Sequence, residues 1–236
     1  MTVHGKKYRE ATALLDLKQT HTPQEAIELA KKASYVGFDE TVEVHLRMGL
    51  NPRNADQQVR GVALLPNGLG KTIRVLVFTQ GPAAKIAEDA GADHVGADDI
   101  VKQIQDGWLE FDTAMATPDM MPKVAKLGKI LGRRGLMPNP KSGTVVQADD
   151  LPRTIADARK GRAEFRLDRT AIIHLAIGKL SFEDEKLLGN LAAVIEAIVK
   201  AKPSGAKGQY IRSITLTSSM GPGLKLDLRS ALALAE

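Results

Sequence analysis

Hydrophobic and polar residues alternate in several segments of this chain, and the clearest alternation runs from Ile211 to Ser219. A period of two is typical of a β-strand, so Ile214 and Leu216 are expected on one face. The other face carries a row of short hydroxyls: Ser213, Thr215, Thr217 and Ser219. Hydroxyls both donate and accept hydrogen bonds, and the glycines of the MGPG turn that follows leave the backbone open to a bulky partner. The pattern predicts either a recognition strand or an ordinary edge strand with a solvated Ser/Thr face.

Strands and helices of the same amphipathic kind occupy both ends of the chain. In the N-terminal part we expect a helix over Pro23–Ser34 and strands over Val42–Met48 and Arg60–Leu65. In the C-terminal part we expect strands over Glu164–Leu167 and Ala171–Ile177, joined by a tight turn at residues 168–170. Ser181 and Asp184 form a capping-type pair before a long helix, whose single apolar face holds Leu187, Leu191, Val194, Ile195 and Ile198.

The middle of the chain has a different pattern. Ile73–Phe78 is almost entirely apolar, which is typical of a strand buried on both faces of a parallel sheet. Helices and short strands then alternate over residues 82–90, 94–95, 98–106, 111–116, 120–131 and 151–160. Alternation at this spacing predicts a small α/β unit. The preceding Pro66–Lys71 segment, with Pro66, Gly68 and Gly70, is the expected hinge or boundary.

These patterns together predict an α+β protein of two domains, one of them discontinuous. Residues 1–67 and 159–236 form an α+β domain built from both termini, and residues 68–158 form an inserted three-layer, Rossmann-like α/β domain. The charges follow the same division. The two ends carry 9 and 13 Lys/Arg against 8 and 8 Asp/Glu, whereas the middle carries 11 against 12. The basic ends make a polyanionic partner plausible.

Composition excludes several classes of protein. The chain of 236 residues is 43% hydrophobic and has no apolar run long enough to span a membrane, so we expect a folded protein without a membrane partner. It has no cysteine, and its five histidines show no metal-ligand spacing, so we expect neither disulfides nor a metal or other cofactor. One tryptophan and few other aromatic residues argue against a base-stacking platform.

Two segments have the composition of phosphate-contacting loops. Residues 67–72 resemble the end of a P-loop, but Leu65 replaces the first glycine and a strand follows where a helix is required. A nucleotide-using α/β enzyme is therefore disfavoured, and no catalytic set can be assembled. Residues 123–141 contain six basic residues and no acid, with Arg133 and Arg134 in a Gly- and Pro-rich loop. This segment is either a phosphate-contacting surface or a solvated face.

Longer motifs resemble one known family nearly from end to end. They are HGKKY at 4–8, FDETVEVH at 38–45, NGLGK at 67–71, AGADHVG at 90–96, DGW at 106–108, LGRRGLMPNPKSGTV at 131–145, AIIH at 171–174, GAKGQYIRS at 205–213 and TSSMGP at 217–222. The chain resembles the bacterial large-subunit ribosomal proteins of the exit-site stalk, the L-one or universal uL-one family.

The resemblance implies a non-catalytic, cytoplasmic component of the large ribosomal subunit that is a monomer when free. Its implied partners are the stalk of 23S ribosomal RNA, exit-site tRNA, whose movement and release it supports, and its own operon mRNA, whose translation it represses. A general RNA-binding chaperone is the alternative; it would bind without preferring one RNA fold.

Carried over by motif, the expected RNA-binding residues are Phe38, Glu40, Thr41, Asp168, Arg169, Thr170, Thr217, Ser218, Ser219, Met220 and Gly221. Candidate phosphate contacts are Lys6, Lys7, Arg53, Arg133 and Arg134. Relatives often have threonine at positions 218 and 219, where this chain has serines that keep the hydroxyl and lack the methyl group.

Overall fold

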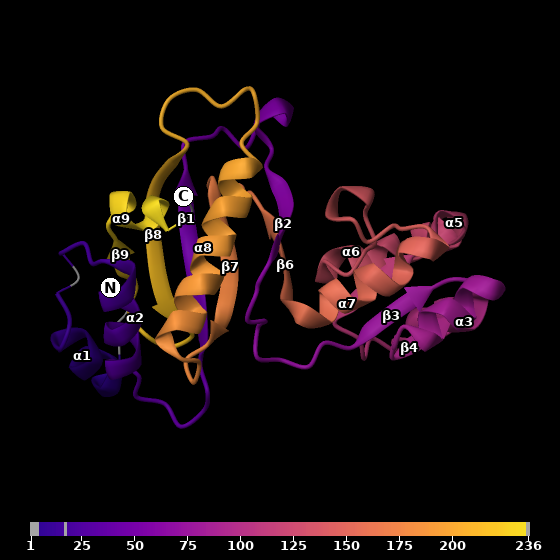
Figure 1. Cartoon of the computed structure of the whole chain (residues 1–236), viewed down its shortest axis with the longest axis horizontal. Coiled ribbons are helices and arrows are strands. Elements are labelled where there is room, and N and C mark those ends of the chain that lie inside the picture. The colour runs from indigo at the N-terminus through magenta and orange to yellow at the C-terminus, as the bar shows by residue number, and fades with distance from the viewer. Residues whose placement is uncertain (1–4, 17, 235–236) are drawn as a thin grey trace. The chain divides into compact units, whose positions relative to one another are not determined.

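The computed structural model describes residues 5–16 and 18–234 (Figure 1). The chain divides into two compact units, one built from the segments up to Gly70 and from Gly161 onward, the other from Lys71–Lys160. Sequence patterns placed these boundaries at residues 67 and 159, a few residues earlier. Helices and strands are both well represented, and the predicted α+β class is confirmed.

The first unit is built on a four-stranded antiparallel sheet in the order β7-β1-β8-β9. Strand β1 (Thr41–Met48) lies between β7 (Ile172–Lys179) and β8 (Ile211–Ser218), so the two ends of the chain meet in one sheet (Figure 1). The short edge strand β9 (Leu224–Leu226) was not predicted. The alternation predicted for β8 is confirmed, since Ile214 and Leu216 are fully buried and the intervening hydroxyl residues are partly exposed.

Among the described residues, helices cover one face of this sheet and leave the other open. Helices α2 (Pro23–Lys32) and α8 (Asp184–Lys200) pack their apolar residues against the buried side chains of β1, β7 and β8. All five residues of the predicted apolar face of α8 are buried. The predicted cap of α8 is wrong, because the helix begins after Glu183 and the Ser181 hydroxyl donates to Asp39 Oδ2 instead (2.7 Å). Two further helices of this unit are α1 (Lys6–Ala13) and α9 (Leu228–Ala233).

Strands β2 (Arg60–Leu64) and β6 (Arg162–Arg166) form a separate antiparallel pair where the chain leaves and re-enters the first unit. The turn at residues 168–170 therefore joins strands of two different sheets. Beyond β2, the predicted hinge segment is held to α8, because buried Asn190 accepts from the Asn67 amide (3.0 Å) and donates to the carbonyls of Gly68 (2.9 Å) and Ile177 (2.7 Å). A hinge at Pro66, Gly68 and Gly70 stays a prediction.

The second unit contains a parallel sheet in the order β4-β3-β5. Its elements are β3 (Val75–Phe78), α3 (Pro82–Asp89), β4 (His94–Gly96), α4 (Asp98–Gln105), β5 (Thr113–Ala116), α5 (Met121–Val124), α6 (Gly128–Arg134) and α7 (Leu151–Gly161). All of β3 is buried, as its apolar sequence predicted. Separate apolar clusters lie on the two faces of the sheet, one with α4, α5 and α6 and one with α3 and α7, which gives three layers.

The single helix predicted over residues 120–131 is wrong. The structure has two short helices, α5 and α6, joined by a 3₁₀ turn at Ala125–Leu127. Pro122, Gly128 and Gly132 lie in this segment, and both residue types have low helix propensity. A hydrophobic periodicity survives the interruption, since Val124, Leu127 and Leu131 are all buried.

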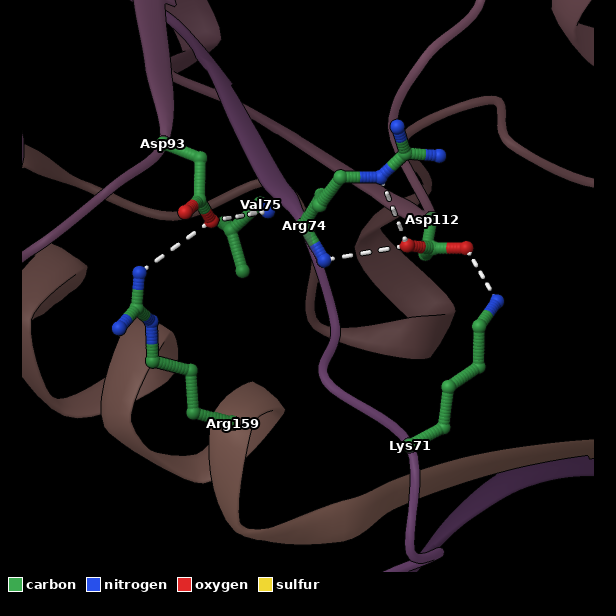
Figure 2. A network of polar contacts seen from close by, with 6 residues as sticks. All are labelled: Lys71, Arg74, Val75, Asp93, Asp112 and Arg159. Carbon is green, nitrogen blue, oxygen red and sulfur yellow. Dashed lines mark hydrogen bonds and ion pairs between the residues drawn. The ribbon is translucent and has the colours of Figure 1, made fainter.

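Two carboxylates tie the ends of the second unit to its sheet (Figure 2). Asp112 lies between Lys71 and Arg74, accepting from the Lys71 ammonium and from the Arg74 backbone N–H (3.1 Å) and Nε (3.4 Å). Asp93 Oδ2 accepts from the Val75 N–H (2.8 Å) and from Arg159 Nη2 on α7 (3.2 Å). The segment entering the unit and the helix leaving it are thus both fixed by charge-assisted hydrogen bonds.

We expect Asp112→Asn to destabilise the second unit by about 1 kcal/mol at pH 7. Burial acts to raise the pKa of Asp112, but the hydrogen bonds from Lys71 and Arg74 outweigh it and hold the pKa below 3.8. A carboxylate with a lowered folded-state pKa stabilises the fold above its unfolded pKa and loses that effect as the pH falls through the folded value. The difference between variant and parent should therefore shrink below pH 3.8.

Fluorescence of Trp108, the one tryptophan in the chain, measures unfolding of this unit in denaturant. Exposed Asp106→Asn serves as the matched control and should leave the midpoint unchanged. An equal loss of stability at pH 7 and at pH 2.5 would contradict the assignment.

Candidate RNA interface

The uncovered face of the four-stranded sheet carries the hydroxyl row. Ser213, Thr215 and Thr217 lie opposite Arg47, His45 and Glu43 of β1, respectively, and all six side chains are at least partly exposed. The row therefore lies beside titratable side chains of the neighbouring strand, which the pattern of β8 alone did not reveal. The face is polar without being dominated by one sign of charge.

At one end of this face, the segment before β1 meets the turn after β8. The Ser219 amide donates to the Thr41 carbonyl (3.0 Å), and the Thr41 amide donates to Ser219 Oγ (3.1 Å). Thr217 Oγ1 donates toward the carbonyls of Ser218 (3.0 Å) and Gly221 (3.2 Å), which leaves its lone pairs to accept from a partner. The predicted residues Thr41, Thr217, Ser219 and Gly221 are thus brought together on a rigid backbone.

Glu40, one of the predicted contact residues, is only 1% exposed. Its carboxylate accepts from the Met220 backbone N–H (2.8 Å) and from Ser34 Oγ (2.8 Å). A buried carboxylate is stable only when such donors surround it. Glu40 therefore positions the turn from beneath. Ser218, at 3% exposure, likewise faces the interior.

Apolar side chains are exposed at the same end of the sheet. Phe38 is 58% exposed and Met220 is 49% exposed, which is unusual for residues of their size. Tyr35 donates its hydroxyl hydrogen bond to the Met220 carbonyl (2.8 Å), and Lys179 donates to Thr41 Oγ1 (3.0 Å). Tyr35 and Lys179 were missed by the motif comparison. The end of the sheet thus combines apolar surface, hydroxyls, backbone groups and one cation; we call it the loop end of the site.

The turn Asp168–Thr170 lies at the other end of the same strands. Strand β1 pairs with β7 from Thr41↔Lys179 to Arg47↔Ile172, so six residues, about 20 Å of strand, separate the turn from the loop end. Asp168 accepts from the amides of Thr170 (2.8 Å) and Ile172 (2.7 Å). Burial acts to raise the pKa of Asp168, but these hydrogen bonds and one from the Thr170 hydroxyl lower it overall.

A polar hollow of about 560 Å³ borders this turn. It is lined by Pro52, Gln58, Arg166, Leu167, Asp168 and Arg169. Arg169 is exposed, and Arg166 and Gln58 are additional groups able to donate hydrogen bonds to a phosphate. Sequence reasoning missed both, because they lie in a strand and a loop far apart in the sequence. The hollow is the second part of the candidate interface, and we call it the turn end.

The candidate phosphate contacts are distributed over both units. Exposed Lys6 and Lys7 begin α1, and exposed Arg53 lies in the loop after β1, all in the first unit. Arg133 and Arg134 form the last turn of α6 in the second unit and are also exposed. Residues 67–72 lead into strand β3, so they lack the helix that a P-loop requires.

The family model of the "Ribosomal protein L1p/L10e family" matches residues 29–222 of the chain. The chain belongs to this family. Among similar proteins named "Large ribosomal subunit protein uL1", that of Dehalococcoides mccartyi is 61% identical over 234 residues, covering 99% of both chains. Those of Chloroflexus aggregans and Thermomicrobium roseum are 58% and 53% identical, over 229 and 233 residues, and the matches cover 97% or more of each chain. The resemblance seen in the motifs is confirmed.

No helix in the described part of the chain is long and apolar enough to cross a membrane. Within residues 5–16 and 18–234, no group of three or more His, Cys, Asp or Glu side chains is arranged to hold a metal ion. Two histidines 129 residues apart in the chain, His45 and His174, do come together on the open face of the sheet.

Proposed function

We propose that this member of the L1 family is a structural constituent of the large ribosomal subunit and binds the stalk region of 23S ribosomal RNA. The proposal is supported by relatives named as large ribosomal subunit proteins, which match the chain over almost its whole length. The observation that carries the choice of surface is the loop end, where Phe38 and Met220 are exposed beside the hydroxyls of Thr217 and Ser219. Buried Glu40 holds the Met220 backbone in place there. On this proposal the protein works on the ribosome in the cytoplasm and performs no catalysis.

Recognition at the loop end relies on shape and hydroxyls. Thr217 and Ser219 have their protons or lone pairs committed to backbone groups, so each offers a fixed orientation to a ribose 2′-hydroxyl. Phe38 and Met220 supply apolar contact for a ribose or a base face. Because the backbone is already ordered in the free protein, little conformational entropy is lost on binding.

Neutralisation of RNA phosphates requires positive charge, and both units carry exposed basic residues. Lys6, Lys7, Arg53 and Arg169 supply positive charge in the first unit, and Arg133 and Arg134 supply it in the second. The loop end and the turn end together span about 20 Å, so a folded RNA can contact both at once. Asp168 acts at the turn end by holding Thr170 and Ile172 in place, and Arg169 is the group that faces the RNA.

Exit-site tRNA and the protein's own operon mRNA are the further proposed partners. An mRNA that repeats the fold of the stalk would use the same surface and give translational repression. A protein that is a monomer when free keeps this surface open for either RNA. The alternative, a general RNA chaperone, would bind through charge alone.

The test is a titration of the protein against the stalk fragment of 23S RNA and an unrelated structured RNA, each at low and high salt, with Thr217→Val beside the parent. Valine keeps the shape of threonine and removes the hydroxyl, so we expect a loss of about tenfold on the stalk fragment. Tight binding to the stalk that persists at high salt supports the proposal. Equal binding of both RNAs, abolished by salt, supports the chaperone alternative.

We expect Arg169→Ala to reduce the salt dependence of stalk binding by about 0.7–0.9 in the slope of log K against log [salt], as for one lost phosphate contact. Its guanidinium is exposed beside a hollow that already contains Arg166. Exposed Lys85→Ala, on α3 of the second unit, is the matched control and should leave the slope unchanged. An unchanged slope for Arg169→Ala would remove the turn end from the interface.

A further inference from the structure

The open face of the sheet holds a pair of histidines in an unusual arrangement. His45 of β1 and His174 of β7 are direct cross-strand partners, and their Nδ1 atoms lie 2.8 Å apart. The rings meet edge to face, with centroids 4.9 Å apart and planes at 66°. Both side chains reach solvent, with 28% and 50% exposure, so the gap between the rings is open on the outer side of the sheet.

A carboxylate lies beside the far nitrogen of each ring. Glu43 Oε2 is 3.9 Å from His45 Nε2, and Asp168 Oδ2 is 3.6 Å from His174 Nε2. The carboxylates favour the tautomer with the proton on Nε2 in each ring. On the other side of β1, the residue of β8 opposite His45 is the uncharged Thr215. This residue therefore places no positive charge beside His45 that would repel a cation between the two rings.

With both Nε2 atoms protonated, two Nδ1 lone pairs face each other across 2.8 Å. The contact is stable in two ways: one ring carries its proton on Nδ1 and donates a neutral hydrogen bond to the other, or a cation, a shared proton or a metal ion, lies between the nitrogens.

We propose that His45 and His174 bind a divalent transition-metal ion of the imidazole-preferring class, such as Zn²⁺, through their Nδ1 atoms. Metal–nitrogen bonds of about 2.0–2.1 Å at a tetrahedral angle need nitrogens about 3.3 Å apart, so a small rotation of the two rings makes room. Water completes the coordination on the open side. Glu43 and Asp168 take the place of the outer carboxylates that orient metal-bound histidines.

This site was not predictable from sequence spacing. Metal motifs on one helix or loop show their ligands a few residues apart, whereas these two ligands are separated by 129 residues and meet only through the register of β1 and β7. Two protein ligands make a weaker site than the four of a structural zinc centre, and the ion remains exchangeable and open to a further ligand.

The experiment uses the full chain without a histidine tag. Zn²⁺ is titrated in competition with a chromophoric chelator, and histidine ¹⁵N resonances are followed by NMR. We expect one Zn²⁺ per chain, a shift of the Nδ1 resonances of both histidines, and at least about tenfold weaker binding in His45→Gln and in His174→Gln. Glu43→Gln, which keeps both ligands, should weaken binding by a smaller factor.

His94→Gln is the matched control, because His94 packs edge-on against Trp108 in the second unit and its loss should leave Zn²⁺ affinity unchanged. Circular dichroism verifies that each variant is folded. Equal Zn²⁺ affinity in the parent and in both single variants would overturn the proposal. So would an Nδ1–H proton shared by the pair that persists at saturating Zn²⁺.

Discussion

Replacing Glu40 by alanine is expected to lower the affinity for stalk RNA by about thirtyfold and the free energy of unfolding by about 3 kcal/mol. The carboxylate accepts two hydrogen bonds at 2.8 Å, and hydrogen bonds to a charged group contribute about 1.5–3 kcal/mol each. Without it, the Met220 amide and the Ser34 hydroxyl lose their partner inside the fold. The turn that presents Met220 would then lose its fixed position, and about 2 kcal/mol of binding energy corresponds to the thirtyfold loss.

Two variants separate this effect from a general loss of charge. Glu40→Gln keeps the shape and one acceptor oxygen, so it should fall between parent and alanine in both measurements. Glu43→Ala removes a half-exposed carboxylate from the neighbouring strand position and should change stability by less than about 0.5 kcal/mol. Denaturant unfolding and RNA titration measure the two effects. A folded Glu40→Ala protein with the parent's RNA affinity would show that the turn does not contribute to binding.

Gly161→Ala should destabilise the first unit by at least about 3 kcal/mol. A Cβ at this position would lie 2.4 Å from Gly68 Cα and 3.1 Å from its carbonyl carbon, and backbone atoms cannot rotate away as a side chain does. The residue also has a φ of 115°, which alanine adopts only with strain. Both effects act at the point where the chain returns to the first unit.

The matched control for Gly161→Ala is Gly107→Ala. Gly107 has a similar φ of 106°, but nothing lies within 4 Å of its added Cβ. Gly107→Ala should therefore lower the free energy of unfolding of the second unit only by the cost of backbone strain, about 1–3 kcal/mol. Far-UV circular dichroism follows both units, and Trp108 fluorescence follows the second. Equal losses in the two variants would mean that strain alone, and not the contact with Gly68, accounts for the effect.

The period of the hydrophobic pattern and the presence of continuous apolar runs were sufficient to predict most of the helices and strands. The strict alternation of β8 and β1 gave the correct buried faces because only one side of an antiparallel sheet is covered here. The continuous apolar run at β3 gave a strand buried on both sides. The elements predicted wrongly or not at all are short or interrupted: β9 has three residues, and the segment expected as one helix is divided into α5 and α6. Segments this short contain too few residues to show a hydrophobic period.

The candidate site was less accessible to sequence reasoning, because its contacts join distant residues. A glutamate is expected at the surface, yet Glu40 is buried because the amide of Met220, 180 residues later, satisfies its charge. Motif comparison grouped Asp168 with Thr217, whereas the strand register places them at opposite ends of the sheet. Lys179 gave no signal of its own, since a single lysine at the end of a strand is common.

The pairing of β2 with β6 has a topological consequence for the second unit. Leu64 lies opposite Arg162, and the Leu65 amide donates to the Gly161 carbonyl (2.9 Å), so the two connections to this unit are adjacent rungs of one antiparallel ladder. In terms of chain connectivity, the whole inserted unit occupies the place of a hairpin loop. The two ends of the inserted unit are joined by a hydrogen bond. The first unit therefore loses little conformational entropy in closing the chain around the insert. Excising it and joining β2 to β6 with a two-residue turn would leave the four-stranded sheet of the first unit together with a separate β2–β6 hairpin.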